Sequence, residues 1–298
     1  MSILVTGGSG FIASHLINKL CKDYKVYLHN RSSRFDAIVS RDNSPTIISG
    51  PLNLDTLSNS EIDNCECIIH LAGSFSASTF EELIFDNLIT TKIILDFMRI
   101  KKIPKIIFIS SAAVWGKNLQ EIPTEKTPAS PETEYAYTKF SAECLIKSAH
   151  SNGDIETAFM LRPNTIYGIG SNAGVIHSLI SQALNGTKFK IFGNGVQRRQ
   201  PLNIQDMVDV IFGCLMFDNK GLNLYGVAGP EAHSILDIAR KIAEIFNVKF
   251  DYEFLSAQTN KPQTILINQS RINNELSWTP KVTLDNGLIA MFNVNKFE

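Results

Sequence analysis

In the first half of the chain, short apolar runs alternate with longer segments of helical periodicity. The runs predict strands at 3–5, 25–28, 46–48, 67–71, 105–109 and 157–161. The segments between them predict helices at 11–22, 81–99 and 134–150. Strands that are apolar on both faces are typical of a parallel sheet covered by helices on each side, and the strand–helix–strand order implies right-handed crossovers. We therefore predict the α/β class, with a Rossmann-type doubly wound parallel sheet.

The second half of the chain has shorter elements and several Gly and Pro breaks. Helices are predicted at 175–184, 204–217 and 235–246, and the one at 204–217 is expected to return to the sheet. We expect residues 1–164, joined by part of 200–230, to form the Rossmann domain. Residues 165–298 then form a smaller mixed α/β region.

A glycine-rich turn, TGGSGFIA at 6–13, connects the first predicted strand to the first predicted helix. Gly7 and Gly10 remove side chains where backbone must approach a pyrophosphate, and the helix N-terminus supplies N–H donors. An ordinary glycine-rich turn is the alternative, but the flanking strand and helix are those that a dinucleotide site requires. We therefore predict a dinucleotide site that includes Gly7, Gly10, Phe11 and Ile12.

The end of the second predicted strand bears on the choice of cofactor. NAD enzymes usually place a carboxylate there, bonded to the ribose 2′-hydroxyl, whereas this chain has Asn30 and Arg31. A guanidinium fits a 2′-phosphate, which a carboxylate would repel. The cofactor is thus NADP or NAD, with NADP slightly favoured, unless Arg31 is a solvated loop charge.

Tyr135 and Lys139 are four residues apart in a predicted helix and therefore share one face. A phenol ordinarily ionises near pH ~10. A neighbouring ammonium and a positively charged nicotinamide ring favour the phenolate, which can exchange a proton while hydride moves to or from the cofactor. The alternative is a half-buried ring beside a solvated charge. Beside the glycine-rich turn, the pair favours hydride chemistry.

Composition excludes several other classes of protein. The chain carries 28 basic and 29 acidic residues, with no basic stripe that would indicate nucleic acid or a membrane surface. No apolar run approaches the ~18 residues of a membrane span. Five scattered cysteines favour a reducing, cytoplasmic location. Six histidines without an HExxH arrangement predict no metal site.

Further motifs follow in order along the chain. They are HLAG at 70–73, DN at 86–87, SSAAVWG at 110–116, LRP at 161–163, IYG at 166–168, GNGVQRR at 193–199, SR at 270–271 and LSWTP at 276–280. With the glycine-rich turn and the Tyr–Lys pair, this pattern resembles the extended short-chain dehydrogenases/reductases. Within them it is most similar to the NAD-dependent epimerase/dehydratase group, which acts on nucleotide sugars.

The resemblance implies roles for individual residues. Ser111 would hydrogen-bond the reacting sugar oxygen, Tyr135 would be the acid/base, and Lys139 would bind the nicotinamide ribose and lower the pKa of the phenol. The other residues implied for the cofactor are Leu52, Leu71, Ala72, Gly73, Asn87 and Pro163. Those implied for the nucleotide sugar are Ser74, Ser111, Asn164, Thr165, Arg199 and Arg271, of which the two arginines would pair with the diphosphate.

Departures from the family pattern narrow the chemistry. Ala112 and Ala113 follow Ser111, where the family's 4,6-dehydratases have Asp and Glu, so dehydration by that route is not expected. Pro51 replaces the Asp that hydrogen-bonds adenine, and Trp115 replaces the usual Tyr as a bulkier wall near the substrate.

We expect an NAD(P)-dependent enzyme that oxidises or reduces a ring carbon, C4, of a nucleotide-linked hexose. An epimerase and a 4-ketoreductase both fit. A reductase of small carbonyl compounds is an alternative that would not need Arg199 and Arg271. A non-catalytic NAD(P)-sensing regulator is another, against which the intact Tyr–Lys pair counts. A homodimer through the helices at 81–99 and 134–150 is expected by analogy.

Overall fold

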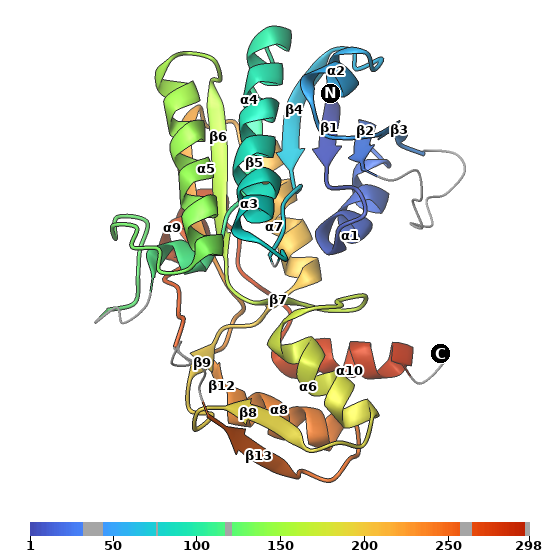
Figure 1. Cartoon of the computed structure of the whole chain (residues 1–298), viewed down its shortest axis with the longest axis vertical. Coiled ribbons are helices and arrows are strands. Elements are labelled where there is room, and N and C mark those ends of the chain that lie inside the picture. The colour runs from blue at the N-terminus through green and yellow to red at the C-terminus, as the bar shows by residue number, and fades with distance from the viewer. Residues whose placement is uncertain (32–43, 76, 117–120, 257–263, 296–298) are drawn as a thin grey trace. The chain divides into compact units, whose positions relative to one another are not determined.

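The computed structural model describes residues 1–31, 44–75, 77–116, 121–256 and 264–295 (Figure 1). The chain divides into two compact units. The first comprises Met1–Gly116, Ala129–Arg162 and Val210–Tyr225, and the second comprises Lys117–Pro128, Pro163–Asp209 and Gly226–Glu298. The assignment of cofactor and substrate to 1–164 and 165–298 stays a prediction.

A seven-stranded sheet in the order β11-β6-β5-β4-β1-β2-β3 forms the centre of the first unit. Its strands are β1 (Ser2–Thr6), β2 (Lys25–Asn30), β3 (Thr46–Ser49), β4 (Cys65–His70), β5 (Lys105–Ile109), β6 (Thr157–Pro163) and β11 (Gly221–Val227). The pairings from β6 to β3 are parallel. The strand order reverses at β1, which is where Rossmann sheets bind ligands beyond the carboxyl ends of their strands. The predicted fold class is therefore confirmed.

Helices cover both faces of this sheet. They are α1 (Phe11–Leu20), α2 (Leu54–Ser58), α3 (Phe80–Leu83), η2 (Ile84–Ile89), α4 (Thr90–Lys101), η3 (Ala112–Trp115), α5 (Glu134–Ser151) and α7 (Ile204–Met216). Helices α4 and α5 lie side by side over one face (Figure 1), where Phe97 and Ile146 join the buried core. Helices α1 and α7 meet where the ammonium of Lys19 lies 4.5 Å from the centre of the Phe212 ring.

The helix predicted at 81–99 is continuous in the structure but not regular. Its middle, η2, is a π-helix, in which the Thr90 N–H donates to the carbonyl of Phe85, five residues back. The hydroxyls of Thr90 and Thr91 donate to the carbonyls of Asp86 and Asn87 at 2.6 and 2.7 Å. The predicted helix is therefore confirmed, while its π-helical middle, which contains the hydrogen-bonded Asn87, was not predicted.

The second unit is a mixed α/β assembly. Its strands pair as β7 (Ile166–Tyr167) with β10 (Leu202–Asn203), β9 (Arg198–Arg199) with β12 (His233–Ser234), and β8 (Phe189–Phe192) with β13 (Tyr252–Leu255). Its helices are α6 (Gly174–Leu184), α8 (Ile235–Ile245), α9 (Ser270–Leu276) and α10 (Leu284–Asn295). Helices α6, α8 and α10 enclose a separate core around Leu179 and Ile242. None of the helices in the described ranges has the length and apolar character needed to span a bilayer.

Candidate functional site

The structure brings Ser111 and Tyr135 into hydrogen-bonding contact. Ser111 follows β5 and caps η3, its Oγ accepting from the Ala113 N–H at 3.2 Å. Tyr135 is the second residue of α5, whose N-terminus is capped by the hydroxyl of Thr133. The end of a parallel strand and the start of a helix thus place two hydroxyls together at the edge of the sheet.

Lys139 lies one turn further along α5 and is only 7 % exposed. Its Nζ donates to the carbonyl of Ile109 at 2.9 Å and lies 5.0 Å from the centre of the Phe108 ring. Burial lowers the pKa of Lys139 to about 8, against the opposing effect of the Glu143 carboxylate. The ammonium is therefore protonated at neutral pH but close to its titration range.

The pKa of Tyr135 shifts in the direction opposite to the prediction. Burial of the phenol raises it to about 12, and the hydrogen bond with Ser111 offsets only part of that rise. The predicted lowering also relied on a positively charged nicotinamide, which the protein groups do not replace. Phe75 packs edge-on against the Tyr135 ring, with ring centres 5.4 Å apart. Only its place two residues after the HLAG motif could have indicated this contact.

The loop after β4 is held against α5. A Cβ on Gly73 would lie 2.7 Å from Asn87 Oδ1 and 3.2 Å from Lys139 Nζ, so this position has no room for a side chain. The Asn87 side chain accepts from the Ser74 N–H at 3.0 Å and donates to the Ser74 carbonyl at 2.9 Å. A third hydrogen bond runs from Asn87 Nδ2 to Thr138 Oγ1 at 3.1 Å. Fully buried, Asn87 braces this loop from within the protein.

The glycine-rich turn fits a pyrophosphate. Gly7 has φ +75°, and a Cβ there would lie 2.7 Å from the Ala72 backbone nitrogen, so this turn and the loop after Leu71 are in direct backbone contact. Helix α1 starts after Gly10, and no side chain of the described residues caps its N-terminus. Its first turn, beginning with Phe11 and Ile12, has no acidic residue. Oriented N–H groups without a competing carboxylate suit an anionic ligand.

Arg31, the residue that favoured NADP, has a carboxylate partner. Its Nη1 lies 3.2 Å from Asp86 Oδ1, and the two residues line a hollow of about 640 Å³. The other lining residues are Ser74, Ala77, Ser78, Glu81, Glu82 and Phe85. Three carboxylates therefore share this hollow with one guanidinium. The adjoining predicted residues Asn30 and Leu52 are buried, and the Asn30 carbonyl accepts from the Gly50 N–H at 3.1 Å.

A buried ion pair lies beneath the site. The Nε and Nη2 of Arg162 donate to the two carboxylate oxygens of Glu143 at 2.8 and 2.6 Å, and Ser110 Oγ donates to the same carboxylate at 2.5 Å. The guanidinium lies 4.7 Å from the centre of the Trp115 ring, and Trp115 is 1 % exposed. The expectation that Trp115 forms a wall near the substrate is thus wrong, because its ring packs under Arg162. Sequence reasoning missed this pair, although Glu143 follows Lys139 by one helical turn.

The remaining predicted residues lie in the second unit. Pro163 ends β6, and the buried Asn164 donates from Nδ2 to the carbonyl of Ile265 at 2.9 Å. Its Oδ1 accepts from the Thr165 N–H at 2.7 Å. Ile265 also donates its N–H to the carbonyl of Arg198 at 3.0 Å. The stretch around Ile265 therefore connects Asn164 to β9.

Two predicted arginines belong to the same unit. Arg199 is half-buried in β9, where burial lowers its pKa, and its Nη1 donates to the carbonyl of Arg198 at 2.9 Å. Arg271, in α9, donates from Nε to Glu275 Oε1 at 2.9 Å. Among the described residues no cluster of three or more His, Cys, Asp or Glu side chains could hold a metal ion.

The chain is similar in sequence and in structure to known proteins. A family model for the NAD dependent epimerase/dehydratase family matches residues 3–224. Mouse dTDP-D-glucose 4,6-dehydratase is 25 % identical over 309 residues, which cover 96 % of this chain and 86 % of that protein. An uncharacterized UDP-glucose epimerase of Bacillus subtilis (strain 168), YtcB, is 28 % identical over 314 residues, or 97 % and 96 % of the two chains. The structure of UDP-glucuronic acid 4-epimerase from Bacillus cereus, solved with UDP-glucuronic acid and NAD, matches with a TM-score of 0.88 at 26 % identity, covering 100 % of this chain and 99 % of the other.

Proposed function

The chain belongs to the NAD dependent epimerase/dehydratase family, and we propose that it is an NAD-dependent 4-epimerase of a nucleotide-linked hexose. The observation that carries the proposal is the contact between Ser111 and Tyr135, with the buried amine of Lys139 one helical turn away. Membership of the family and the glycine-rich turn both support the binding of a nicotinamide dinucleotide at this site. The enzyme is of the extended short-chain dehydrogenase/reductase type, and the proposal assigns one particular reaction to it.

The three residues have distinct roles in the proposed reaction. Bound NAD would supply a reversible hydride acceptor for the ring carbon. Tyr135 removes the proton of the sugar hydroxyl and later returns it, and Ser111 hydrogen-bonds the same oxygen. Lys139, with a pKa of about 8, supplies a positive charge at neutral pH that favours the phenolate of Tyr135.

The residues after Ser111 disfavour dehydration as the main reaction. Ala112 and Ala113 form the start of η3, and Ala112 is buried. Methyl groups cannot carry a proton to or from C5 or C6 of a sugar. The similarity to dehydratases therefore supports a shared oxidation step and not the elimination of water.

The acidic hollow beside Arg31 supports NAD over NADP, in place of the preference stated from sequence. The carboxylate of Asp86 already pairs with Arg31, and Glu81 and Glu82 add negative charge that would repel a 2′-phosphate. The similar Bacillus cereus enzyme was solved with NAD. The main argument for a ketoreductase was a preference for NADP, so a site that favours NAD weakens that alternative.

We assign substrate recognition to Ser74, Asn164, Thr165, Arg199 and Arg271, in addition to Ser111. The arginines of the second unit are proposed as ligands of the diphosphate, which guanidinium groups bind in bidentate fashion. Since Arg271 pairs with Glu275, it would exchange that carboxylate for the diphosphate. A homodimer and a cytoplasmic location remain expectations.

The test is turnover of UDP- and dTDP-linked hexoses by the purified protein, with products followed by NMR and the cofactor by absorbance. An epimerase interconverts C4 epimers without net change in NAD. Tyr135→Phe should lower turnover at least about 100-fold. Tyr137→Phe, on the same helix and 53 % exposed, is the matched control and should leave turnover unchanged.

Three results would contradict the proposal. Equal turnover by wild type and Tyr135→Phe would remove the acid/base role. Stoichiometric consumption of reduced cofactor would identify a ketoreductase. Full turnover of small carbonyl compounds by Arg199→Met would favour a reductase that needs no diphosphate.

A further inference from the structure

A chain of hydrogen bonds runs through buried polar residues behind the loop that follows β4. The Ala72 N–H donates to Thr6 Oγ1 at 3.2 Å, and Thr6 Oγ1 lies 2.7 Å from His70 Nδ1. On the other side of the ring, His70 Nε2 lies 3.1 Å from Thr91 Oγ1, which donates to the Asn87 carbonyl at 2.7 Å. Thr6, His70, Thr91 and Asn87 are each at most 1 % exposed, so water does not compete for these bonds.

Neighbouring groups fix the direction of every bond in this chain. The Thr91 hydroxyl has one hydrogen, and the Asn87 carbonyl, which can only accept, takes it. His70 Nε2 must therefore carry a proton and donate to Thr91 Oγ1. In a neutral imidazole the other nitrogen then accepts, so the Thr6 hydroxyl donates to Nδ1 while its oxygen accepts from Ala72. One arrangement of hydrogens satisfies all four bonds.

The ring is also held in its neutral form. Burial lowers the pKa of His70 to about 3, and the positive charge of Lys139 and the neighbouring His29 act in the same direction. In a protonated ring both nitrogens donate, so Nδ1 could no longer accept the hydrogen of the Thr6 hydroxyl. That hydroxyl would then be without its acceptor. His70 is therefore no pH switch in the neutral range, and its role must be geometric.

The chain continues to the catalytic helix through Asn87. The Asn87 side chain fixes both backbone groups of Ser74 and donates to Thr138 Oγ1 at 3.1 Å. The Thr138 hydroxyl in turn donates to the carbonyl of Tyr135 at 2.9 Å. A continuous path therefore joins Thr6, which directly precedes Gly7, to the backbone of Tyr135.

We propose that His70 is a positioning residue, locked as the neutral Nε2–H tautomer, which couples the glycine-rich turn to the start of α5 and so sets the place of Tyr135 relative to the cofactor. The inference rests on the proposed function for the role of Tyr135. Displacement of a catalytic group by about 1 Å can lower a rate ~100-fold. Loss of one link should hence reduce the rate of hydride transfer more than it weakens binding.

Two adjacent threonines provide a matched comparison. Thr90 and Thr91 are both buried, and each hydroxyl donates to the carbonyl four residues back, but only Thr91 contacts His70. Thr91→Val should lower kcat roughly 10-fold and leave KM within about twofold of the wild-type value. The substitution breaks the hydrogen-bond chain at His70 and removes no contact to the substrate. Thr90→Val should retain kcat, and Thr91→Ser, which keeps the hydroxyl, should restore it. Equal kcat values for Thr90→Val and Thr91→Val would overturn the coupling.

A second measurement does not depend on turnover. Long-range ¹H–¹⁵N spectra of the whole protein should show His70 protonated at Nε2 and unprotonated at Nδ1, without change from about pH 5 to 8. In Thr91→Val this preference for Nε2 should be lost. A ring that titrates in this range, or that is protonated at Nδ1, would refute the locked tautomer. If no nucleotide sugar is turned over, the proposed function fails while the tautomer is still decided by the spectra.

Discussion

Burial of the Lys139 ammonium reduces folding stability, so its removal should make the protein more stable at neutral pH. The pKa of Lys139 falls from the ordinary 10.5 to about 8. At about 1.4 kcal/mol per pKa unit, a charged Lys139 lowers the free energy of unfolding by about 3 kcal/mol at pH 7. Lys139→Met removes this term but also takes the Nζ donor from the Ile109 carbonyl, which costs about 1 kcal/mol. The expected net gain is about 2 kcal/mol, together with a loss of turnover.

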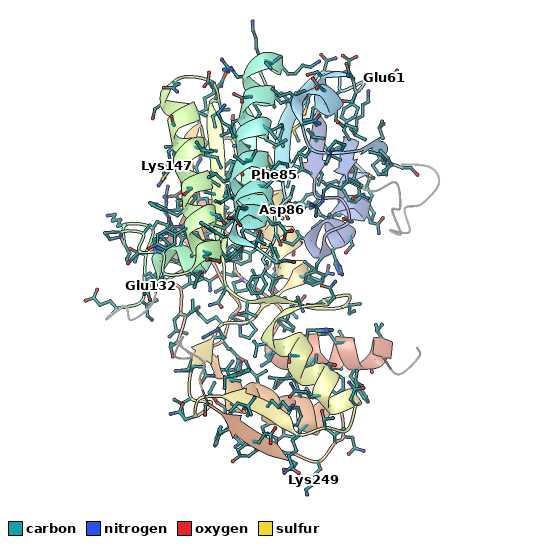
Figure 2. The ribbon with its side chains drawn as sticks, viewed as in Figure 1. Glu61, Phe85, Asp86, Glu132, Lys147 and Lys249 are labelled. Carbon is teal, nitrogen blue, oxygen red and sulfur yellow. The ribbon has the colours of Figure 1, made fainter. Side chains whose placement is uncertain are left out.

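The assay is urea unfolding at several pH values, with Lys147→Met as control. Lys147 is half-buried on the same helix (Figure 2), and its replacement should change stability by less than about 0.5 kcal/mol. Folded Lys139 releases its proton near pH 8 and the unfolded residue near 10.5. In this window the unfolded state binds more protons, so wild type becomes more stable with rising pH. The advantage of Lys139→Met is thus largest below pH 8 and shrinks above it, and a variant less stable than wild type at pH 7 would refute the reasoning.

Three further predictions concern individual contacts. Asp86→Asn should lower the Kd for NADP roughly 10-fold with the Kd for NAD unchanged, because a carboxylate that repels the 2′-phosphate is removed; calorimetric titration measures both. Glu143→Gln should cost about 3–5 kcal/mol of unfolding free energy by leaving the buried charge of Arg162 without its partner, as urea unfolding would show. Gly73→Ala should lower kcat at least about 10-fold, since a Cβ would lie 2.7 Å from Asn87 Oδ1; steady-state kinetics of the folded variant tests it.

The strands and most helices could be predicted because burial leaves a direct trace in the sequence. Strands covered on both faces are continuous apolar runs, as in β5, and the start of α5 is marked by a capping threonine. The meeting of Ser111 and Tyr135 follows from the same logic, since parallel strands bring their carboxyl ends to one edge. Secondary structure and the centre of the site were thus accessible without coordinates.

Features that depend on residues far apart in the sequence could not be predicted. The residues next to Arg31 in sequence include no carboxylate, so Arg31 favoured NADP. Its carboxylate partner Asp86 lies 55 positions away and could not be identified from the sequence. Trp115, at the end of η3, packs against Arg162 of the distant strand β6. The π-helical turn carries ordinary helical periodicity, and Asn87 within it is held by hydrogen bonds to Ser74 and Thr138, which are distant in sequence. Pairings across the fold, and not local propensity, decide these three.

The π-helix Ile84–Ile89 makes this part of the chain intolerant of changes in length. A π-turn holds about one residue more than an α-turn, so deletion of a single residue here would let the helix close with regular 3.6-residue turns. The helical residues on either side would keep their orientation, because the π-turn is what accommodates the extra residue, but residues within the turn would move to other positions around the axis. Asn87 could no longer face Ser74 and Thr138 together. Relatives that keep this brace should therefore show substitutions in the segment but no single-residue gaps.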